Sequence, residues 1–548
     1  MATALNMTPI PNYARKSTRS WPYSMNAFAL FIIDGTPYHH CTASLPTSSF
    51  AFFFEYQSAV LYNWPYSVYD RQKYALWISI LQVSQYLRGI GLESPELWSR
   101  IAIADPRWVS EFLERSRSND LRVVMDISWK SSHDVDLLKR VMDNSKRISA
   151  LDISFQLRYW RDLLPSLKSP APHLTVLRLE MTGEDHDLRT NPPSIPVDLF
   201  SATLSVLNHL HIEHFHVELE HPLFTKTNLT TLSIMFPLNI IGTLDMLQLL
   251  ERLPALRSLC LSYALGLVSG ASSYLVSLPN LTWLDLRHTG LDVNKNFLES
   301  IVLQEGVDVS LYSGEIDLGT QNLVDDVIDS VKIAVKKTSL LFRDIKIEWV
   351  GCEPLVYITC MKEPRYKSGM LASPFVEIGF GFKAQRKPRD PLEWLLKLPK
   401  SLLSPLEVLH FQNVGSIPPE IWDYLSGTLP NLRHLYLGSP DDTVAFVEYL
   451  TLRHPDDSSA VHTTAFGHRD NPEMVYPALR RLTLLVFIPP YECLLALRCP
   501  LATRKQRGMG LDELCIIDRG QQNPEARLEV EVALGAQVKT IRWREDWE

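Results

Sequence analysis

The sequence predicts a mixed α/β solenoid, a fold in which each strand–helix repeat packs on the repeats before and after it. Three observations predict this fold: a recurring apolar phrase, its spacing, and helix-like stretches between its copies. The phrase P-x-L-x-x-L-x-L occurs five times, beginning at Pro172, Pro254, Pro279, Pro430 and Pro477. The middle leucines of four successive units are 22, 27 and 25 residues apart, at Leu210, Leu232, Leu259 and Leu284. A period of about 20–29 residues is typical of such stacked repeats.

Less complete copies of the phrase extend the array. The core L-x-x-L-x-L, with Leu or Ile at all three sites, begins at Ile148, Leu207, Leu229 and Leu511, and a copy ending in phenylalanine begins at Leu406. Weaker copies begin at Phe342, Phe375 and Val538. The gaps between middle leucines reach 47 residues near the carboxyl end, so we expect an irregular array with insertions on its outer side.

The phrase has a physical meaning in a strand. Successive side chains point to opposite faces, so the last two leucines of each copy share one face and their neighbours share the other. One strand cannot bury its leucines alone, and the copies therefore stack as parallel strands over a common core. Residues 443–453, which follow Asp441-Asp442, have helical spacing and an acidic start, so we expect them on the outer side. Unrelated αβ units in a globular fold are the alternative.

Size and composition exclude several function classes. The chain has 548 residues, of which 46% are hydrophobic and 21% charged, values that are ordinary for folded proteins. The net charge of −8 disfavours a nucleic-acid-binding protein, which normally carries a basic stripe. No window has the roughly 18–20 apolar residues of a membrane span. Seven cysteines without a CxxC pair favour a reducing compartment, so we expect a cytoplasmic or nuclear protein with no membrane partner.

In phrase and period the chain resembles leucine-rich-repeat proteins. The resemblance implies a ribonuclease-inhibitor-like horseshoe over residues 102–548. Repeats of this family usually follow the strand with an asparagine or cysteine that links successive turns. This chain has other residues at those positions, namely Phe215, Ala264, Thr289 and Pro440, so no asparagine ladder is expected. That departure suits the irregular branch of the family.

Residues 44–101 have a different character. The stretch from Ile80 to Ile101 predicts an amphipathic helix, a break at Ser94-Pro95 and an apolar anchor at Leu97-Trp98. It resembles the second half of an F-box, matched at Val83, Ser84, Leu87, Arg88, Leu92, Pro95, Leu97 and Trp98. The first half is matched at Leu45, Pro46, Phe50, Phe53 and Phe54, with Ser48 where the family has glutamate. Together with the repeats this is similar to large fungal, basidiomycete-type F-box proteins; residues 1–43 are expected to be irregular or disordered.

The resemblance implies a non-enzymatic role in a ubiquitin ligase. F-box helices dock on the Skp adaptor of a Skp–cullin–F-box complex, while the repeats select a protein substrate. The adaptor-binding residues that the match implies are Leu45, Pro46, Phe50, Phe54, Val83, Leu87, Leu97 and Trp98. Two alternatives stay open. These residues could only cap the first layer of the repeat core, or the protein could be a repeat scaffold without ligase association.

The strand residues between the leucines are the candidate substrate-binding surface. Around the clearest copies of the phrase these are Trp283, Asp285, Arg287, His434 and Tyr436, with Arg178 and Glu180 earlier in the chain. Trp, Tyr and Arg are the residues that most often anchor protein interfaces. An exposed tryptophan that covers a neighbouring turn is the alternative.

Other site chemistries have weaker support. The stretch 208–221 contains five histidines, which invites a metal hypothesis, but His209 and His211 flank Leu210 and are expected to face solvent on a strand. We find no G-x-S-x-G motif and no phosphate-binding G-x-x-x-x-G-K-[ST] loop. We therefore expect no catalytic centre, cofactor or metal.

Overall fold

The computed structural model describes the chain from Gln85 to Arg544 with gaps. The described residues are 85–102, 106–127, 132–182, 192–202, 204–225, 228–266, 274–287, 291–304, 307–316, 344–350, 355–361, 376–382, 400–412, 417–453, 475–486, 491–518 and 524–544. All of them belong to the second of two compact units into which the chain divides, Tyr74–Glu548. The predicted segment 1–43 and the first half of the F-box-like module lie outside the described residues.

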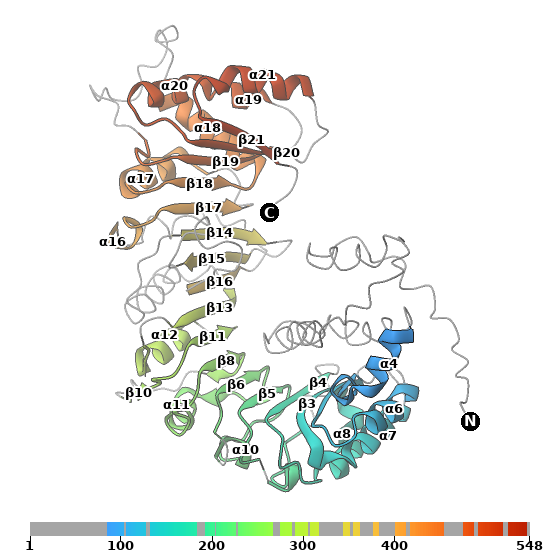
Figure 1. Ribbon diagram of the computed structural model, residues 1–548. Coiled ribbons are helices and arrows are strands. Elements are labelled where there is room, and N and C mark those ends of the chain that lie inside the picture. The colour runs from blue at the N-terminus through green and yellow to red at the C-terminus, as the bar shows by residue number, and fades with distance from the viewer. Residues whose placement is uncertain are drawn as a thin grey trace. The chain divides into compact units, whose positions relative to one another are not determined.

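The main element of the described residues is a sheet of 17 strands, most of which are labelled in Figure 1. In their order across the sheet, the strands are β1 (Arg100–Ala102), β2 (Leu121–Ile127), β3 (Ile148–Gln156), β4 (Val176–Thr182), β5 (His209–Glu213), β6 (Thr231–Met235), β8 (Ser258–Ser262), β11 (Trp283–Arg287), β13 (Asp308–Ile316), β16 (Val376–Phe382), β15 (Leu355–Met361), β14 (Asp344–Val350), β17 (Val408–Gln412), β18 (His434–Leu437), β19 (Arg481–Val486), β20 (Glu513–Asp518) and β21 (Thr540–Arg544). Neighbours are parallel except at β15, which is antiparallel to both strands beside it. The large parallel sheet confirms the predicted α/β class.

The leucines of the recurring phrase align across the sheet. The middle position forms one row of register partners, each at most 2% exposed: Val123, Leu151, Leu177, Leu210, Leu232, Leu259, Leu284 and Val309. The same row continues over β17–β20 as Leu409, Leu435, Leu482 and Leu514. The first leucine of the phrase is buried as well, for example Leu174 and Leu281. The predicted alternation is confirmed: the aliphatic positions build the core.

Side-chain hydrogen bonds link successive strand–helix units where the strands begin. The hydroxyl of Thr175 donates to the carbonyl of Ser149, 26 residues earlier, at 2.8 Å. Thr230 and Thr282 make the same bond across 22 and 25 residues. Asn239 joins two turns by accepting from the Val217 N–H at 2.7 Å and donating to its carbonyl at 3.0 Å. Polar side chains, mainly hydroxyl groups, therefore link successive turns. They lie at other positions than Phe215, Ala264, Thr289 and Pro440, where the sequence has no asparagine.

Helices lie along one side of the sheet (Figure 1). Among the described residues, the helices of at least eight residues after the first strand are α6 (Pro106–Arg115), α7 (Ser132–Met142), α8 (Leu157–Leu167), α11 (Thr243–Glu251), α12 (Leu291–Ser300), α17 (Pro419–Thr428), α18 (Pro440–Arg453), α20 (Arg498–Gln506) and α21 (Pro524–Gly535). Trp160 of α8 stacks on Phe155 of β3 at 5.3 Å between ring centroids, and Trp422 of α17 meets Phe411 of β17 edge-on at 5.6 Å. These contacts place the helices over the buried strand positions.

The predicted helix over 443–453 is present as α18 and begins three residues earlier. Pro440 occupies the first turn, where its missing N–H costs nothing. The Ser439 hydroxyl accepts from the Asp442 N–H at 3.1 Å, which satisfies one of the unpaired amides of that turn. The helix start is thus encoded by serine and proline together with the acidic pair.

An inserted ribbon interrupts the regular order of strands. β13 is paired with β16, and β17 is paired with β14, while β15 lies between β16 and β14. The three strands therefore occupy the sheet in the reverse of their chain order. The sequence predicted β14 and β16 from weak copies of the phrase, but β15 has no copy and was not predicted.

The amino-terminal end of the described chain confirms the predicted helix and break. Helix α4 (Gln85–Glu93) ends before Ser94, whose extended backbone starts α5 (Pro95–Trp98) with proline in the first turn. Trp98 is 1% exposed: its indole N–H donates to the Gly91 carbonyl at 2.7 Å, and its ring packs on Phe112 of α6 at 5.4 Å.

Among the described residues, no helix has the length and apolar character that crossing a bilayer requires.

Candidate partner-binding surface

The sheet has a second face, formed by the residues that alternate with the buried leucines. We call it the polar face and define it by the strand positions next to the leucine row on β3–β6, β8, β11 and β17–β21. Because register is continuous within each run of strands, side chains at equivalent positions lie side by side. Neighbouring strands are roughly 4.8 Å apart, so the polar face is a close array of side chains.

On β3–β5 the polar face carries a charged group around Arg178. Its guanidinium donates to Glu180 at 2.9 Å and lies 3.7 Å from Asp152, its register partner on β3. The side chains of Arg178 and Glu180 are only 12% and 14% exposed. An ion pair this recessed holds its geometry better than an exposed one.

His211 on β5 was predicted to face solvent, and that prediction is wrong. The residue is 3% exposed. Its Nδ1 lies 2.9 Å from the Ser233 hydroxyl and its Nε2 lies 3.2 Å from Glu213. Burial lowers the pKa of His211, although the Glu213 carboxylate opposes that shift, so the ring is held neutral. Within the described ranges, no three His, Cys, Asp or Glu side chains converge as metal ligands.

The predicted residues Trp283, Asp285 and Arg287 lie together on β11. Asp285 is fully buried, and the Arg287 guanidinium donates to both of its carboxylate oxygens, with Nε at 3.0 and 2.8 Å. Trp283 and Arg287 are partly exposed. Asp285 therefore positions Arg287, and in this arrangement only Trp283 and Arg287 present atoms to solvent.

Cys260, the register partner of Asp285 on β8, is not a reactive thiol. Its Sγ donates to Asp285 Oδ2 at 3.6 Å, and the residue is 7% exposed. Burial and the negative charge of Asp285 raise the pKa of Cys260 to about 12. The thiolate is the nucleophile and metal ligand, so a thiol of this kind is inert at neutral pH.

The predicted residues His434 and Tyr436 lie on β18, six strands away from β11 in the sheet order. Six steps of roughly 4.8 Å separate them from Trp283, or about 29 Å along the sheet. The sequence-predicted residues therefore form two groups. His434 Nε2 lies 3.0 Å from the Thr483 hydroxyl, and His410 of β17 packs on Tyr436 at 5.1 Å.

Sequence reasoning missed the charged partners of this second group. Glu513 of β20 lies 3.1 Å from Arg481 of β19 and 3.3 Å from Arg542 of β21. Beside them, Leu485, Cys515 and Ile517 form a buried apolar cluster against which Tyr436 packs. The signal was present: each of these residues occupies an alternate position of a predicted strand.

A row of aromatic rings follows strands β5, β6 and β8. His214, Phe236 and Tyr263 each come directly after a strand and have positive φ values of 61°, 47° and 53°. The rings stack, at 5.2 Å between His214 and Phe236 and 4.8 Å between Phe236 and Tyr263. Left-handed backbone is uncommon for residues other than glycine, so stacking and the strand-end hydrogen bonds must offset its cost.

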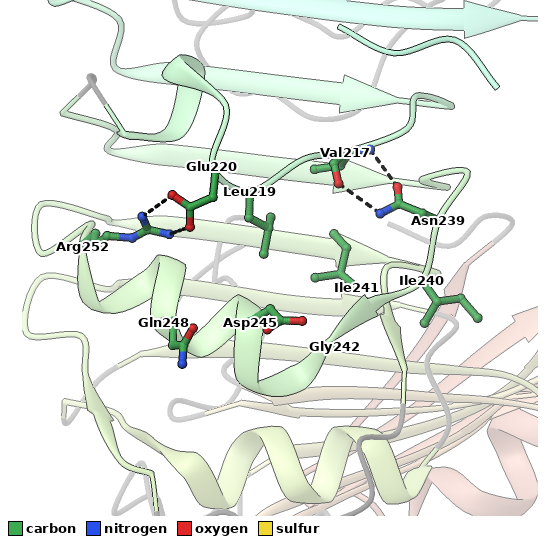
Figure 2. Close-up of a pocket in the computed structure, with 10 residues that line it drawn as sticks. All are labelled: Val217, Leu219, Glu220, Asn239, Ile240, Ile241, Gly242, Asp245, Gln248 and Arg252. Atoms are coloured by element: carbon green, nitrogen blue, oxygen red, sulfur yellow. Dashed lines mark hydrogen bonds and ion pairs between the residues drawn. The ribbon is translucent and has the colours of Figure 1, made fainter. Parts of the chain in front are cut away.

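A shallow pocket of about 290 Å³ lies near helix α11 (Figure 2). Leu219, Ile240 and Ile241 give it apolar walls, while Glu220 and Arg252 form two hydrogen bonds of 3.1 Å at its rim. Its lining residues come from α11, from the short strand β7 (Ile241–Gly242) before it and from the segments after β5 and β6, outside the polar face. It contains no residue that the sequence singled out.

No family model and no curated protein matches the chain. Among solved structures, the chain is similar to one in the "Crystal structure of Rad7 and Elc1 complex in yeast", with 15% identity, a TM-score of 0.26, and coverage of 72% of this chain and 92% of that chain.

Proposed function

We propose that this protein is the substrate-recognition subunit of a Skp–cullin–F-box ubiquitin ligase. The repeats would form a leucine-rich-repeat solenoid that holds a substrate protein, and the amino-terminal module would bind the Skp adaptor and, through it, the cullin complex. The protein performs no chemistry of its own in this role. It acts by raising the local concentration of substrate near the ubiquitin-conjugating enzyme.

The observation that carries the proposal is the polar face. One side of the sheet is buried in the leucine core beneath the helices. The other side presents Trp283, Arg287, His434 and Tyr436. Aromatic and arginine side chains at partly exposed positions are typical anchors of protein interfaces. A row of strands also holds them on rigid backbone, which lowers the entropy lost on binding.

The adaptor half of the proposal rests on the F-box resemblance, with one revision. Leu97 and Trp98 are 4% and 1% exposed, and Trp98 is held by Phe112 and the Gly91 carbonyl. Their burial favours a capping role for these two residues. We therefore assign adaptor docking to Leu45, Pro46, Phe50, Phe54, Val83 and Leu87, whose side chains lie outside the described set.

The same burial favours a second candidate function. If the whole module 44–101 only covers the end of the repeat core, the protein is a leucine-rich-repeat scaffold that binds a partner without joining a ligase. The polar face would serve that role equally well, so the two functions are distinguished by whether the protein binds the adaptor.

Co-purification with a Skp-family adaptor tests the choice. The full chain, a Leu45→Ala/Phe54→Ala variant and a Leu528→Ala control would each be co-expressed with the adaptor. Leu528 is 61% exposed on α21, so its truncation should leave the fold and adaptor binding intact. The ligase proposal expects the full chain and the control to retain the adaptor and the double variant to lose it. Absence of binding by the full chain would establish the scaffold function instead.

A further inference from the structure

The polar face reverses its charge along the sheet. Over β3–β11 it carries Asp152, Glu180, Glu213 and Asp285 against Arg178 and Arg287, and Asp308 lies beside this section on the neighbouring strand β13. Over β17–β21 it carries Arg481, Arg542 and Arg544 against Glu513. The whole chain has a net charge of −8, so the β17–β21 section is a local exception.

The positive charges of this section stand out from the surface, while its negative charge is recessed. The side chains of Arg481 and Arg542 are 44% and 55% exposed, and that of Glu513 between them is 14% exposed. A recessed carboxylate that contacts two arginines fixes their positions. Each guanidinium has five N–H donors in a planar fork, which suits it to bind further carboxylates.

An apolar and aromatic area adjoins the arginines. Leu485 and Ile517 are 2% and 3% exposed and support Tyr436, which is half-buried. The His410 ring packs on both aromatic residues of β18, with ring centroids 5.1 Å apart for His410–Tyr436 and 5.9 Å apart for His410–His434. A supported tyrosine beside arginines has the composition of an interface hot spot.

We propose that strands β17–β21 form a binding site for an acidic segment of a partner protein. Arg481 and Arg542 would bind its carboxylates, and an adjacent apolar side chain would pack on Tyr436. The two arginines are two strands apart, about 10 Å, and are offset by two residues along the strands, about 7 Å, so roughly 12 Å separates them, which an extended peptide covers in about four residues. This inference rests on the proposed substrate-receptor function and names the chemical class of its substrate.

Fluorescence anisotropy with the purified full chain tests the site without the adaptor. The probe is a labelled 12-residue peptide of alternating glutamate and leucine, and the comparison is the same peptide with glutamine in place of glutamate. We expect the acidic peptide to bind at least ten-fold more tightly and its affinity to fall as salt rises from 50 to 300 mM. Equal binding of the two peptides would overturn the proposal.

Matched variants locate the site. Arg481→Gln/Arg542→Gln should weaken acidic-peptide binding at least ten-fold. Arg252→Gln should leave it unchanged, because Arg252 is also an ion-paired arginine, 39% exposed, but lies near α11. Unchanged thermal unfolding of all three proteins confirms that they are folded. If Arg252→Gln weakens acidic-peptide binding as much as Arg481→Gln/Arg542→Gln does, the peptide does not bind at β17–β21.

A nucleic acid is the competing kind of ligand for an arginine-rich surface. Labelled poly(U) RNA should bind at least ten-fold more weakly than the acidic peptide under the same conditions. If RNA binds more tightly, and loses affinity in Arg481→Gln/Arg542→Gln, the peptide proposal is overturned. Loss of adaptor binding alone, with acidic-peptide binding retained, would refute the ligase function and leave this site standing.

Discussion

Truncation of Leu284 to alanine tests the stacked core directly. Leu284 is completely buried on β11, and its register partners Leu259 and Val309 are 0% and 2% exposed. Backbone ladders hold the strands on both sides, so the vacated space cannot close without moving them. We therefore expect a loss in the upper half of the roughly 2–5 kcal/mol range that buried Leu→Ala changes cost.

Urea unfolding and amide hydrogen exchange measure this loss. Repeat arrays open locally, so exchange should rise in β8, β11 and β13 by about two orders of magnitude for a loss of about 3 kcal/mol, with little change in β20. Leu528→Ala is the matched control, since it makes the same chemical change at a 61% exposed position and should stay within about 0.5 kcal/mol. If the two variants cost the same, the strands do not share a continuous core.

Substitutions at four other positions give independent tests. Trp98→Ala should lower the free energy of unfolding by about 3–5 kcal/mol, because the ring is 1% exposed; a change below 1 kcal/mol would remove its capping role. Arg504→Met should cost at least about 1–3 kcal/mol in urea unfolding, since the guanidinium donates to the carbonyls of Val475, Tyr476 and Leu479 at 2.5, 2.9 and 3.3 Å; a neutral result would mean that water replaces these bonds. Tyr263→Val should be less stable than Tyr263→Gly by about 1–2 kcal/mol, because both lose the stacking but only glycine accepts a φ of 53° freely; equal stabilities would contradict the strain. Burial raises the pKa of Asp308 to about 6, so the folded state binds this proton more tightly than the unfolded state and stability falls as pH rises from about 4 to 6; Asp308→Asn should raise the Tm at pH 7 and leave it nearly unchanged at pH 4, and an equal shift at both values would exclude this titration.

The strands were predictable because their signal is local. Leu435 and Leu437, or Leu514 and Ile516, show their alternation within five residues, and burial of one face is all that alternation requires. The inserted ribbon was not predictable from this signal. β15 contains no copy of the phrase, and the choice of neighbours for β13 and β17 depends on pairing between distant segments.

The candidate site was predicted in position but not in detail. The sequence placed Trp283, Arg287 and Tyr436 on the face away from the leucines, where the structure has them. It could not show that Asp285 is fully buried beneath Arg287, because burial of a polar strand residue depends on its cross-strand neighbours. Pairing of Arg481 and Arg542 with Glu513 likewise requires the register of three strands.

The reversed order of β14, β15 and β16 has a consequence for synthesis on the ribosome. β13 ends at residue 316, and its outer neighbour β16 ends at residue 382, so 66 further residues must be translated before that edge can pair. At about 5–20 residues per second, the edge of β13 stays unpaired for roughly 3–13 s. By comparison, only 31 further residues, from 182 to 213, must be translated before β4 can pair with β5. A nascent chain paused there displays an open strand with free amides and carbonyls, which is where a chaperone would bind first and where aggregation would begin.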